Sequence, residues 1–335
     1  MKKLTFSLLV ALSFAFPVFA QTDVDSIVRK AKTMFLSKQR AEAVEEINKA
    51  IALEPGNPDL YLTRAEFYLF LQNKSEVLND AQKAAALAPT DKKILYRAGL
   101  VLLRGLQFKE ALKISEELTA LGDLDRQGWG LRIQIKRSLK DFIGAFEDAS
   151  RAIELFPEDD YLKQAQADLI RLLGDSEKAL EIYDSIIAAN EKKLSLANAQ
   201  SDKTSIKRAL SLFLFNRARI NLAKSLMEPA LADLAKAIEY LPDGNNYFRR
   251  AGIYVEHKMY AEALADFSKI IDEKLIFDRS FVYLQRGNVY FMTQKYAEAL
   301  ADYEEAVKLN ESMRQYAQKR IALIKQKTTE ISQPK

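Results

Sequence analysis

The side chains best suited to catalysis are scarce in this 335-residue sequence. Cysteine is absent, and histidine occurs once, as His257 in the segment "EHKM". Catalytic triads and most zinc sites need more partners than a lone histidine in a polar segment offers. We therefore interpret His257 as an exposed turn residue, rather than as a general base or a metal ligand.

Carboxylates are abundant, but their spacing indicates no site. The acidic segment "PEDD" at 157–160 precedes a helical pattern, and the helix dipole favours acids at a helix start. The segment lacks the ligand spacing of a calcium loop. The 11 glycines include no phosphate-binding loop. The sequence therefore predicts a protein that is not an enzyme and that has no metal site and no cofactor.

The first 20 residues, "MKKLTFSLLVALSFAFPVFA", form a distinct segment. Two lysines precede an apolar run from Leu4 to Phe16, and Ala20 is a small residue suited to cleavage by signal peptidase. This pattern, which is typical of bacteria, predicts a signal peptide at 1–20. The rest of the chain is then exported, to the periplasm or as a secreted protein. The alternative is an uncleaved anchor, for which residues 4–20 are short.

Charge and hydropathy restrict the partners. The formal charge of +4 falls further when Lys2 and Lys3 leave with the signal peptide, so the charge does not favour nucleic acid. No later apolar run approaches the length of about 20 residues that spans a bilayer. We therefore expect no stable membrane insertion after cleavage, and packing without disulfides must stabilise the fold.

A repeat of 34 residues runs through the chain. Pro55, Pro89 and Pro157 close three units at multiples of this spacing. When this proline is numbered 32, position 20 is alanine in seven of eight units and position 8 is small in seven of eight. The units begin at Val24, Pro58, Lys92, Arg126, Asp160, Ser211, Gly244 and Ser280.

Each unit has the pattern of two helices. In the last unit, Tyr283, Gly287 and Tyr290 recur at helical spacing, and after the short polar turn "TQK" the pattern continues with Ala299 and Tyr303. A small residue on each helix allows the two axes to approach closely, while the aromatic neighbours fill the space beside the contact. The fold class is therefore expected to be all-α.

These units resemble tetratricopeptide repeats, whose pattern is Trp-x2-Leu-Gly-x2-Tyr, then Ala-x3-Phe, then Pro. Tyr283, Gly287, Tyr290 and Ala299 match it, with Arg286 in place of leucine, and Trp129 occupies the tryptophan position of the fourth unit. The resemblance implies a right-handed α-solenoid of about eight tetratricopeptide-like helix pairs with a C-terminal capping helix.

The predicted organisation follows from the repeat and its interruptions. Units one to five occupy 21–191, a helical insertion or hinge occupies 192–208, and units six to eight occupy 209–311. A capping helix at 312–330 and a disordered tail at 331–335 complete the chain. Because good helix formers are frequent in the insertion, we expect extended helices on both sides of a break near Ser201-Asp202. A plain loop is the alternative.

The capping helix is predicted from one apolar stripe. Ser312 and Gln315 form a possible capping box at its start. Its basic face is interpreted as solvated, with contact to anionic lipid as the alternative. The stripe consists of Met313, Tyr316, Ala317, Ile321 and Ile324.

The resemblance also implies a concave groove, lined by positions 2, 5, 9 and 12 of the first helix of each unit. These positions are largely apolar in units six to eight and polar in units four and five. The candidate peptide groove consists of Phe215, Arg219, Leu222, Phe248, Phe281, Leu284, Asn288 and Phe291, and a secondary patch of Leu62, Leu69, Tyr96 and Leu103.

Two readings of this groove remain open. Contiguous apolar groups on a surface usually mark an interaction site, with aromatic anchors and with Arg219 and Asn288 as polar contacts. Alternatively, these residues meet the insertion, the terminal helix or a neighbouring unit. Lysine at position 5 and asparagine at position 9 never occur together, so binding of a chaperone-type C-terminal tail is not supported.

The sequence therefore predicts an exported protein-binding or scaffold protein of the cell envelope, without catalysis. Its partner is a protein or peptide held in the groove. The alternative is a small-molecule or glycan-binding protein that uses groove aromatics such as Phe248 and Tyr283. A closed pocket ringed by polar groups would favour the glycan, and an open apolar channel would favour the peptide.

Overall fold

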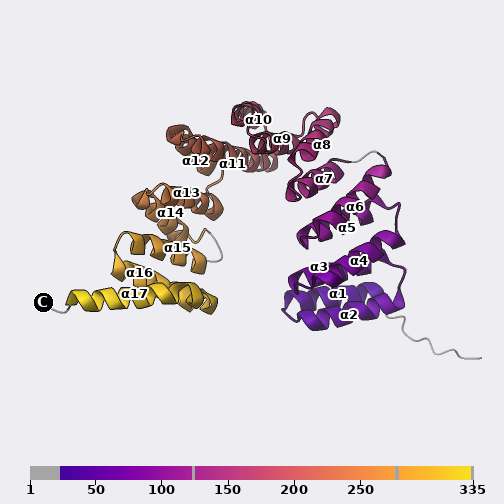
Figure 1. Ribbon diagram of the computed structural model, residues 1–335, viewed down its shortest axis with the longest axis horizontal. Helices are drawn as coiled ribbons and strands as arrows, with labels where there is room; N and C mark the ends of the chain where they lie inside the picture. Colours follow the sequence, from indigo (N-terminus) through magenta and orange to yellow (C-terminus); the bar gives the residue numbers. More distant parts are fainter. Residues whose placement is uncertain (1–22, 123–124, 276–278, 333–335) are drawn as a thin grey trace, which may run out of the picture. The chain divides into compact units, whose positions relative to one another are not determined.

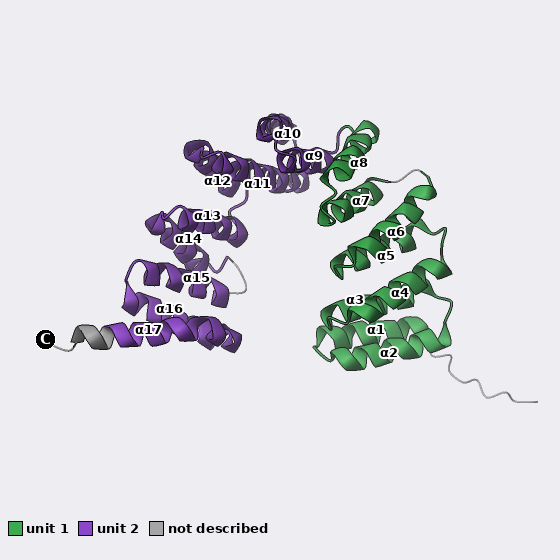
Figure 2. Ribbon diagram, in the orientation of Figure 1, with its two compact units in different colours: residues 1–157 green, residues 158–335 purple. Residues whose placement is uncertain are grey.

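The computed structural model describes residues 23–122, 125–275 and 279–332, and of residues 328–332 only the backbone. The regular elements described are all helices, and they form two compact units, residues 1–157 and 158–335 (Figure 2). The predicted signal peptide at 1–20 lies outside the described residues. Of the predicted tail, Ile331 and Ser332 are helical, and the rest lies outside.

The first compact unit contains four helix pairs (Figure 1). Their bounds are α1 Val24–Leu36 and α2 Arg40–Leu53, α3 Pro58–Phe70 and α4 Lys74–Leu87, α5 Lys92–Arg104 and α6 Phe108–Ala120, and α7 Arg126–Ser138 and α8 Phe142–Leu155.

The second compact unit contains four further pairs, a short 3-10 helix and a terminal helix (Figure 1). Their bounds are α9 Asp160–Leu172 and α10 Ser176–Leu196, α11 Gln200–Ala223 and α12 Met227–Tyr240, α13 Gly244–Glu256 and α14 Tyr260–Asp272, α15 Arg279–Met292 and α16 Tyr296–Leu309, η1 Glu311–Met313 and α17 Arg314–Ser332.

Six of the eight predicted unit starts are the first residue of a helix, because the local start signals are strong. Asn57 caps α3 by accepting from the Asp59 amide at 3.0 Å, and Pro58 takes the first helical position. The exceptions are α11, which begins at Gln200 ahead of Ser211, and α15, which begins one residue early.

The turn inside every pair has one backbone conformation. Position 15 of each unit has a positive φ, and Gly174 is the one glycine among the eight. The amide that follows it donates to the carbonyl five residues back, for example Gln107 to Leu102 at 2.9 Å and Lys295 to Tyr290 at 2.9 Å. This six-to-one bond closes a Schellman turn, and it explains how three residues suffice to reverse the chain.

The small residues at positions 8 and 20 lie in the interior of the last helix pair. Ala299 is fully buried, and a Cβ added to Gly287 would lie 3.0 Å from Cε1 of Tyr303. That separation is shorter than ordinary van der Waals contact, so α15 and α16 approach this closely because position 8 lacks a side chain. Gly287, Ala299 and Ala306 therefore act in packing, as the periodicity predicts.

The insertion is helical on both sides, but its break lies earlier than predicted. Ala197 and Ala199 have extended backbone and separate α10 from α11. The predicted break near Ser201-Asp202 is wrong, because these residues form the first turn of α11, where Asp202 favours the helix dipole. The two compact units divide at Pro157 and Glu158, and α10 and α11 both belong to the second.

The terminal helix packs on one side as predicted, but the prediction is wrong for one residue of its apolar stripe and for its N-terminal cap. Ala317 and Ile324 are buried in a cluster with Tyr303, whereas Tyr316 is 55% exposed and does not belong to the buried stripe. The Asn310 side chain, rather than a Ser312–Gln315 box, accepts from the Ser312 amide at 3.1 Å. The 3-10 turn that precedes α17 moves the cap two residues towards the N-terminus.

Candidate functional site

A buried ion pair recurs within the helix pairs and accounts for Arg286. An arginine at position 7 of the first helix binds an aspartate 16 residues later on the second helix, and four of these pairs are bidentate. Lys30 and Glu46 take the same positions in the first unit. The five arginine pairs are Arg64–Asp80, Arg132–Asp148, Arg217–Asp233, Arg250–Asp266 and Arg286–Asp302.

Aromatic rings at positions 4 and 11 enclose several of these guanidinium groups. The Arg286 carbon lies 5.5 Å from the Tyr283 ring centroid and 5.8 Å from that of Tyr290. The hydrogen bond to Asp302 raises the pKa of Arg286. Because these charges are paired and enclosed, we assign them to stability. These ion pairs were not predicted, although the sequence places an aspartate 16 residues after each of these arginines.

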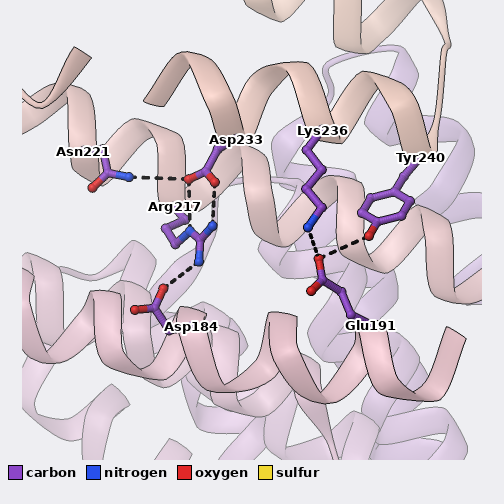
Figure 3. Close-up of polar contacts among 7 residues, drawn as sticks. All are labelled: Asp184, Glu191, Arg217, Asn221, Asp233, Lys236 and Tyr240. Atoms are coloured by element: carbon purple, nitrogen blue, oxygen red, sulfur yellow. Dashed lines mark hydrogen bonds and ion pairs between the residues drawn. The ribbon is translucent and has the colours of Figure 1, made fainter. Parts of the chain in front are cut away.

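Two groups of polar contacts connect α10, α11 and α12 (Figure 3). Arg217 on α11 donates to Asp184 on α10 at 2.6 Å and to both carboxylate oxygens of Asp233 on α12 at 3.0 and 2.6 Å. Glu191 on α10 accepts from Lys236 and from the Tyr240 hydroxyl on α12. These contacts therefore hold α10 against the sixth helix pair.

In both groups the carboxylates are paired with cations. The hydrogen bond from Lys236 holds the pKa of Glu191 below its ordinary value, so the carboxylate stays charged and engaged. Burial raises the pKa of Tyr240. Among residues 23–122, 125–275 and 279–327, no group of histidine and carboxylate side chains has the geometry to hold a metal ion. No helix in the described part of the chain has the length and apolar character needed to cross a membrane.

Three predicted groove residues are buried, and the prediction is wrong for them. Leu62 is fully buried, and Leu103 and Leu284 are 7% and 4% exposed. Leu284 packs in the cluster that contains Ala317 and Ile324 of α17, so the terminal helix covers it. This outcome matches the alternative reading of the groove.

The remaining groove candidates of the last two helix pairs each contact an aromatic side chain of the fold. Phe281 is 42% exposed, and its ring centroid lies 5.7 Å from that of Phe248, which also meets Phe267 edge-on at 5.6 Å. Asn288 accepts from the Tyr303 hydroxyl at 2.9 Å, so its acceptor oxygen is already engaged. Phe291 packs edge-on against Tyr296 at 5.9 Å.

Two members of the secondary patch are half-buried in the first compact unit. Leu69 packs beside a cluster that contains Ala65 and Val101. Tyr96 lines a pocket of about 410 Å³ together with Lys92, Lys93 and Arg97. The Lys92 ammonium group donates to the Gly122 carbonyl at 2.7 Å, so part of this positive charge is occupied. The patch therefore is no continuous apolar surface.

The structure brings Phe215, Arg219 and Leu222 together in one pocket between α11 and α13. Its volume is about 450 Å³, and we call it the α11–α13 pocket. Its apolar part is completed by Ala223, Gly252 and Ile253, and its polar part consists of Arg219, Arg249, Glu256 and His257.

The charged groups of this pocket are not tied to each other. The Arg249 carbon lies 4.7 Å from the Phe215 ring centroid, so the guanidinium group rests on the ring. Within the described part of the chain, Arg219, Arg249 and Glu256 form no ion pair. Arg250, which follows Arg249 in the sequence, instead forms a bidentate ion pair with Asp266. Two guanidinium groups therefore offer N–H donors to the pocket.

Gly252 keeps the pocket open. A Cβ added at this residue would meet nothing within 4 Å. The pocket lies between α11 and α13, the first helices of the sixth and seventh pairs. The Asp243 side chain caps α13 at its first residue, Gly244. Gly252 occupies groove position 9 but is not in the predicted candidate set, and Arg249 occupies position 6, which lies outside the implied groove positions.

Comparisons with known proteins agree with the helix-pair architecture. Residues 280–313 match the family model of the tetratricopeptide repeat. The chain is similar to the crystal structure of a tetratricopeptide repeat protein from Parabacteroides merdae, with a TM-score of 0.55 and 16% identity over 77% of this chain and 95% of that one. The expected all-α solenoid of helix pairs with a C-terminal helix is therefore confirmed.

Curated relatives are similar over part of the chain. Human mitochondrial import receptor subunit TOM70 is 26% identical over 232 residues, which cover 64% of this chain and 37% of that protein. A Protein SGT1 homolog from Oryza sativa subsp. japonica is 33% identical over 92 residues, 28% of this chain and 24% of that one. The chain thus matches about a third or less of these relatives' lengths. The match of residues 280–313 to the family model supports the tetratricopeptide repeat class.

Proposed function

We propose that this protein is a non-catalytic protein-binding scaffold of the cell envelope and that it holds a protein or peptide segment along the first helices of its second compact unit. The observation that carries the proposal is the α11–α13 pocket. It gathers three predicted groove residues, one of which is Arg219, around an apolar floor and adds Arg249, and neither arginine forms an ion pair with a described residue. Apolar anchors with a few placed polar groups are typical of peptide recognition.

The relatives support protein binding as the function class. TOM70 is named as an import receptor subunit, and neither curated relative is named as an enzyme. In Figure 3, Asp184 and Asp233 are paired with Arg217 and Glu191 is paired with Lys236, which supports a role for these groups in helix packing. The envelope location rests on the signal peptide predicted at 1–20.

The pocket favours a peptide over a glycan. A sugar ring needs a free aromatic face, and the Arg249 guanidinium group lies on the Phe215 ring. The two aromatics named for the glycan alternative are engaged in packing, since Phe248 meets Phe267 and Tyr283 lies against Arg286. A peptide needs only the apolar floor and the donors that surround it.

Site-directed photo-cross-linking tests the proposal. A benzophenone amino acid replaces Ala223 in one variant and His257 in a second, because both residues are exposed and line the pocket without being among its proposed contacts. Gly130 on α7 is the control outside the pocket, since a Cβ added there meets nothing within 4 Å. We expect both pocket variants to label the same protein of an envelope extract and the Gly130 variant not to label it. Equal labelling at all three positions, or none at the pocket, contradicts the proposal.

A further inference from the structure

We infer that the α11–α13 pocket recognises an internal peptide segment in which an acidic side chain stands next to an apolar one. This inference rests on the proposed function and specifies the chemistry of the partner. It does not require a free C-terminal carboxylate. Positions 5 and 9 of the two helices that line the pocket are Phe215 and Arg219, and Phe248 and Gly252, which differ from a lysine–asparagine carboxylate set.

The acidic side chain is inferred from Arg249 and Arg219. Stacking on Phe215 holds the Arg249 guanidinium group in place and leaves its N–H edge unoccupied by any described side chain. Arg219 lies one helical turn beyond Phe215 on α11 and lines the same pocket. A planar guanidinium group is suited to bind a carboxylate through two N–H donors. Two such groups at one pocket therefore favour a carboxylate between them.

The adjacent apolar side chain is inferred from the floor. Leu222 and Ile253 line the pocket beside Gly252, whose missing side chain leaves space above the backbone. Burial of an aliphatic or aromatic side chain there removes apolar surface from water on both sides. The volume of about 450 Å³ accommodates one large side chain together with the short carboxylate side chain beside it.

Glu256 makes the two ends of the pocket differ in charge. It lies seven residues after Arg249 on α13, which places it about 10 Å further along the helix axis. A second acidic side chain at that end of the peptide would face the Glu256 carboxylate and be repelled. The pocket therefore selects one acidic residue at its Arg249 end, and not a run of acidic residues that extends to the α13 terminus.

A blocked peptide library tests the inference on the full-length protein. Nine-residue peptides with acetylated and amidated ends, degenerate at every position, are selected on the immobilised protein. We expect enrichment of aspartate or glutamate next to leucine, isoleucine or phenylalanine. The best selected peptide and its copy with the acid changed to the corresponding amide are then compared by fluorescence anisotropy. The acidic form should bind at least about tenfold more tightly, since hydrogen bonds to charged groups are the stronger ones.

Four variants and two controls locate the effect. Arg219→Gln and Arg249→Gln should each reduce the preference for the acidic form about tenfold, and Gly252→Trp should abolish binding of both forms. Glu256→Gln should increase affinity for a peptide with a second acid, a gain that loss of structure cannot produce. Arg208→Gln, at an exposed arginine on the α11 extension, and Gly130→Trp should leave binding unchanged.

Three results overturn the inference. They are no enrichment, equal binding of the acidic and amide peptides, and an acid preference that survives both arginine substitutions. Photo-cross-linking at Ala223 and His257 separates these results from failure of the proposed function. If the partner still cross-links at both positions, the scaffold function stands and only the inferred peptide chemistry fails. If cross-linking also fails, both proposals fail.

Discussion

Gly287→Ala gives the sharpest test of the packing argument, because Gly252→Ala is its matched control. Both glycines lie inside a first helix, so alanine should stabilise each helix by about 0.8–1.0 kcal/mol through backbone entropy. At Gly252 the new methyl group meets nothing within 4 Å, and this gain should appear in full.

At Gly287 the same methyl group has no space. It would lie 3.0 and 3.1 Å from two ring carbons of Tyr303 and 3.2 Å from Cβ of Asp302. The Tyr303 ring is fully buried and its hydroxyl donates to Asn288, so the ring cannot move freely. Overpacking of this kind costs about 1–3 kcal/mol, which exceeds or cancels the helix gain.

Urea unfolding followed by circular dichroism measures the comparison. We expect Gly252→Ala to unfold at higher urea than the unmodified protein and the two variants to differ by about 1–3 kcal/mol. Hydrogen exchange should assign the loss in Gly287→Ala to α15 and α16. If Gly287→Ala is stabilised as much as Gly252→Ala, position 8 is not a close contact and the reasoning is refuted.

Three further predictions concern the turns and the ionic contacts. Leu106→Gly should stabilise the protein in thermal unfolding by about 0.5–1 kcal/mol, because Leu106 is 62% exposed and has a φ of 60° that favours glycine; a lower midpoint would contradict this. Asp302→Ala should cost about 3–5 kcal/mol in urea unfolding by leaving Arg286 unpaired, and a cost below 1 kcal/mol would show that the pair is dispensable. The pKa of Glu191 is lowered by folding, so its contribution is present above the ordinary carboxyl pKa and lost as pH falls through the lowered value. Glu191→Gln should therefore reduce the loss of melting temperature between pH 6 and pH 3, and an unchanged pH profile would contradict the role of its contact with Lys236.

The helix pairs could be predicted because their signals are local. Start residues such as Asn57 and Pro58, and the small residues at positions 8 and 20, act within one repeat, and the structure places helices where they indicate. The left-handed residue at position 15 was not predicted, because seven of the eight are not glycine. Here the closing hydrogen bonds of the turn outweigh the intrinsic preference of the residue.

The candidate site was predicted only in part, because exposure depends on neighbouring elements. Leu284 and Phe215 both occupy position 5 of a first helix. The terminal helix buries Leu284, whereas the absence of a side chain at Gly252 leaves space beside Phe215. The repeat pattern predicts neither the contact with the terminal helix nor the space beside Phe215. Arg249 was missed for a related reason, since its importance comes from the Phe215 ring on the preceding first helix and not from its own repeat position.

The recurrent ion pairs also bear on how the chain folds. Each arginine–aspartate pair joins residues 16 positions apart, so it closes within one helix pair and requires no distant part of the chain. Contacts of such short sequence separation cost little loop-closure entropy and are typical of fast-folding domains. Each of these five helix pairs thus contains an ion pair that can form during synthesis as soon as both of its helices have emerged.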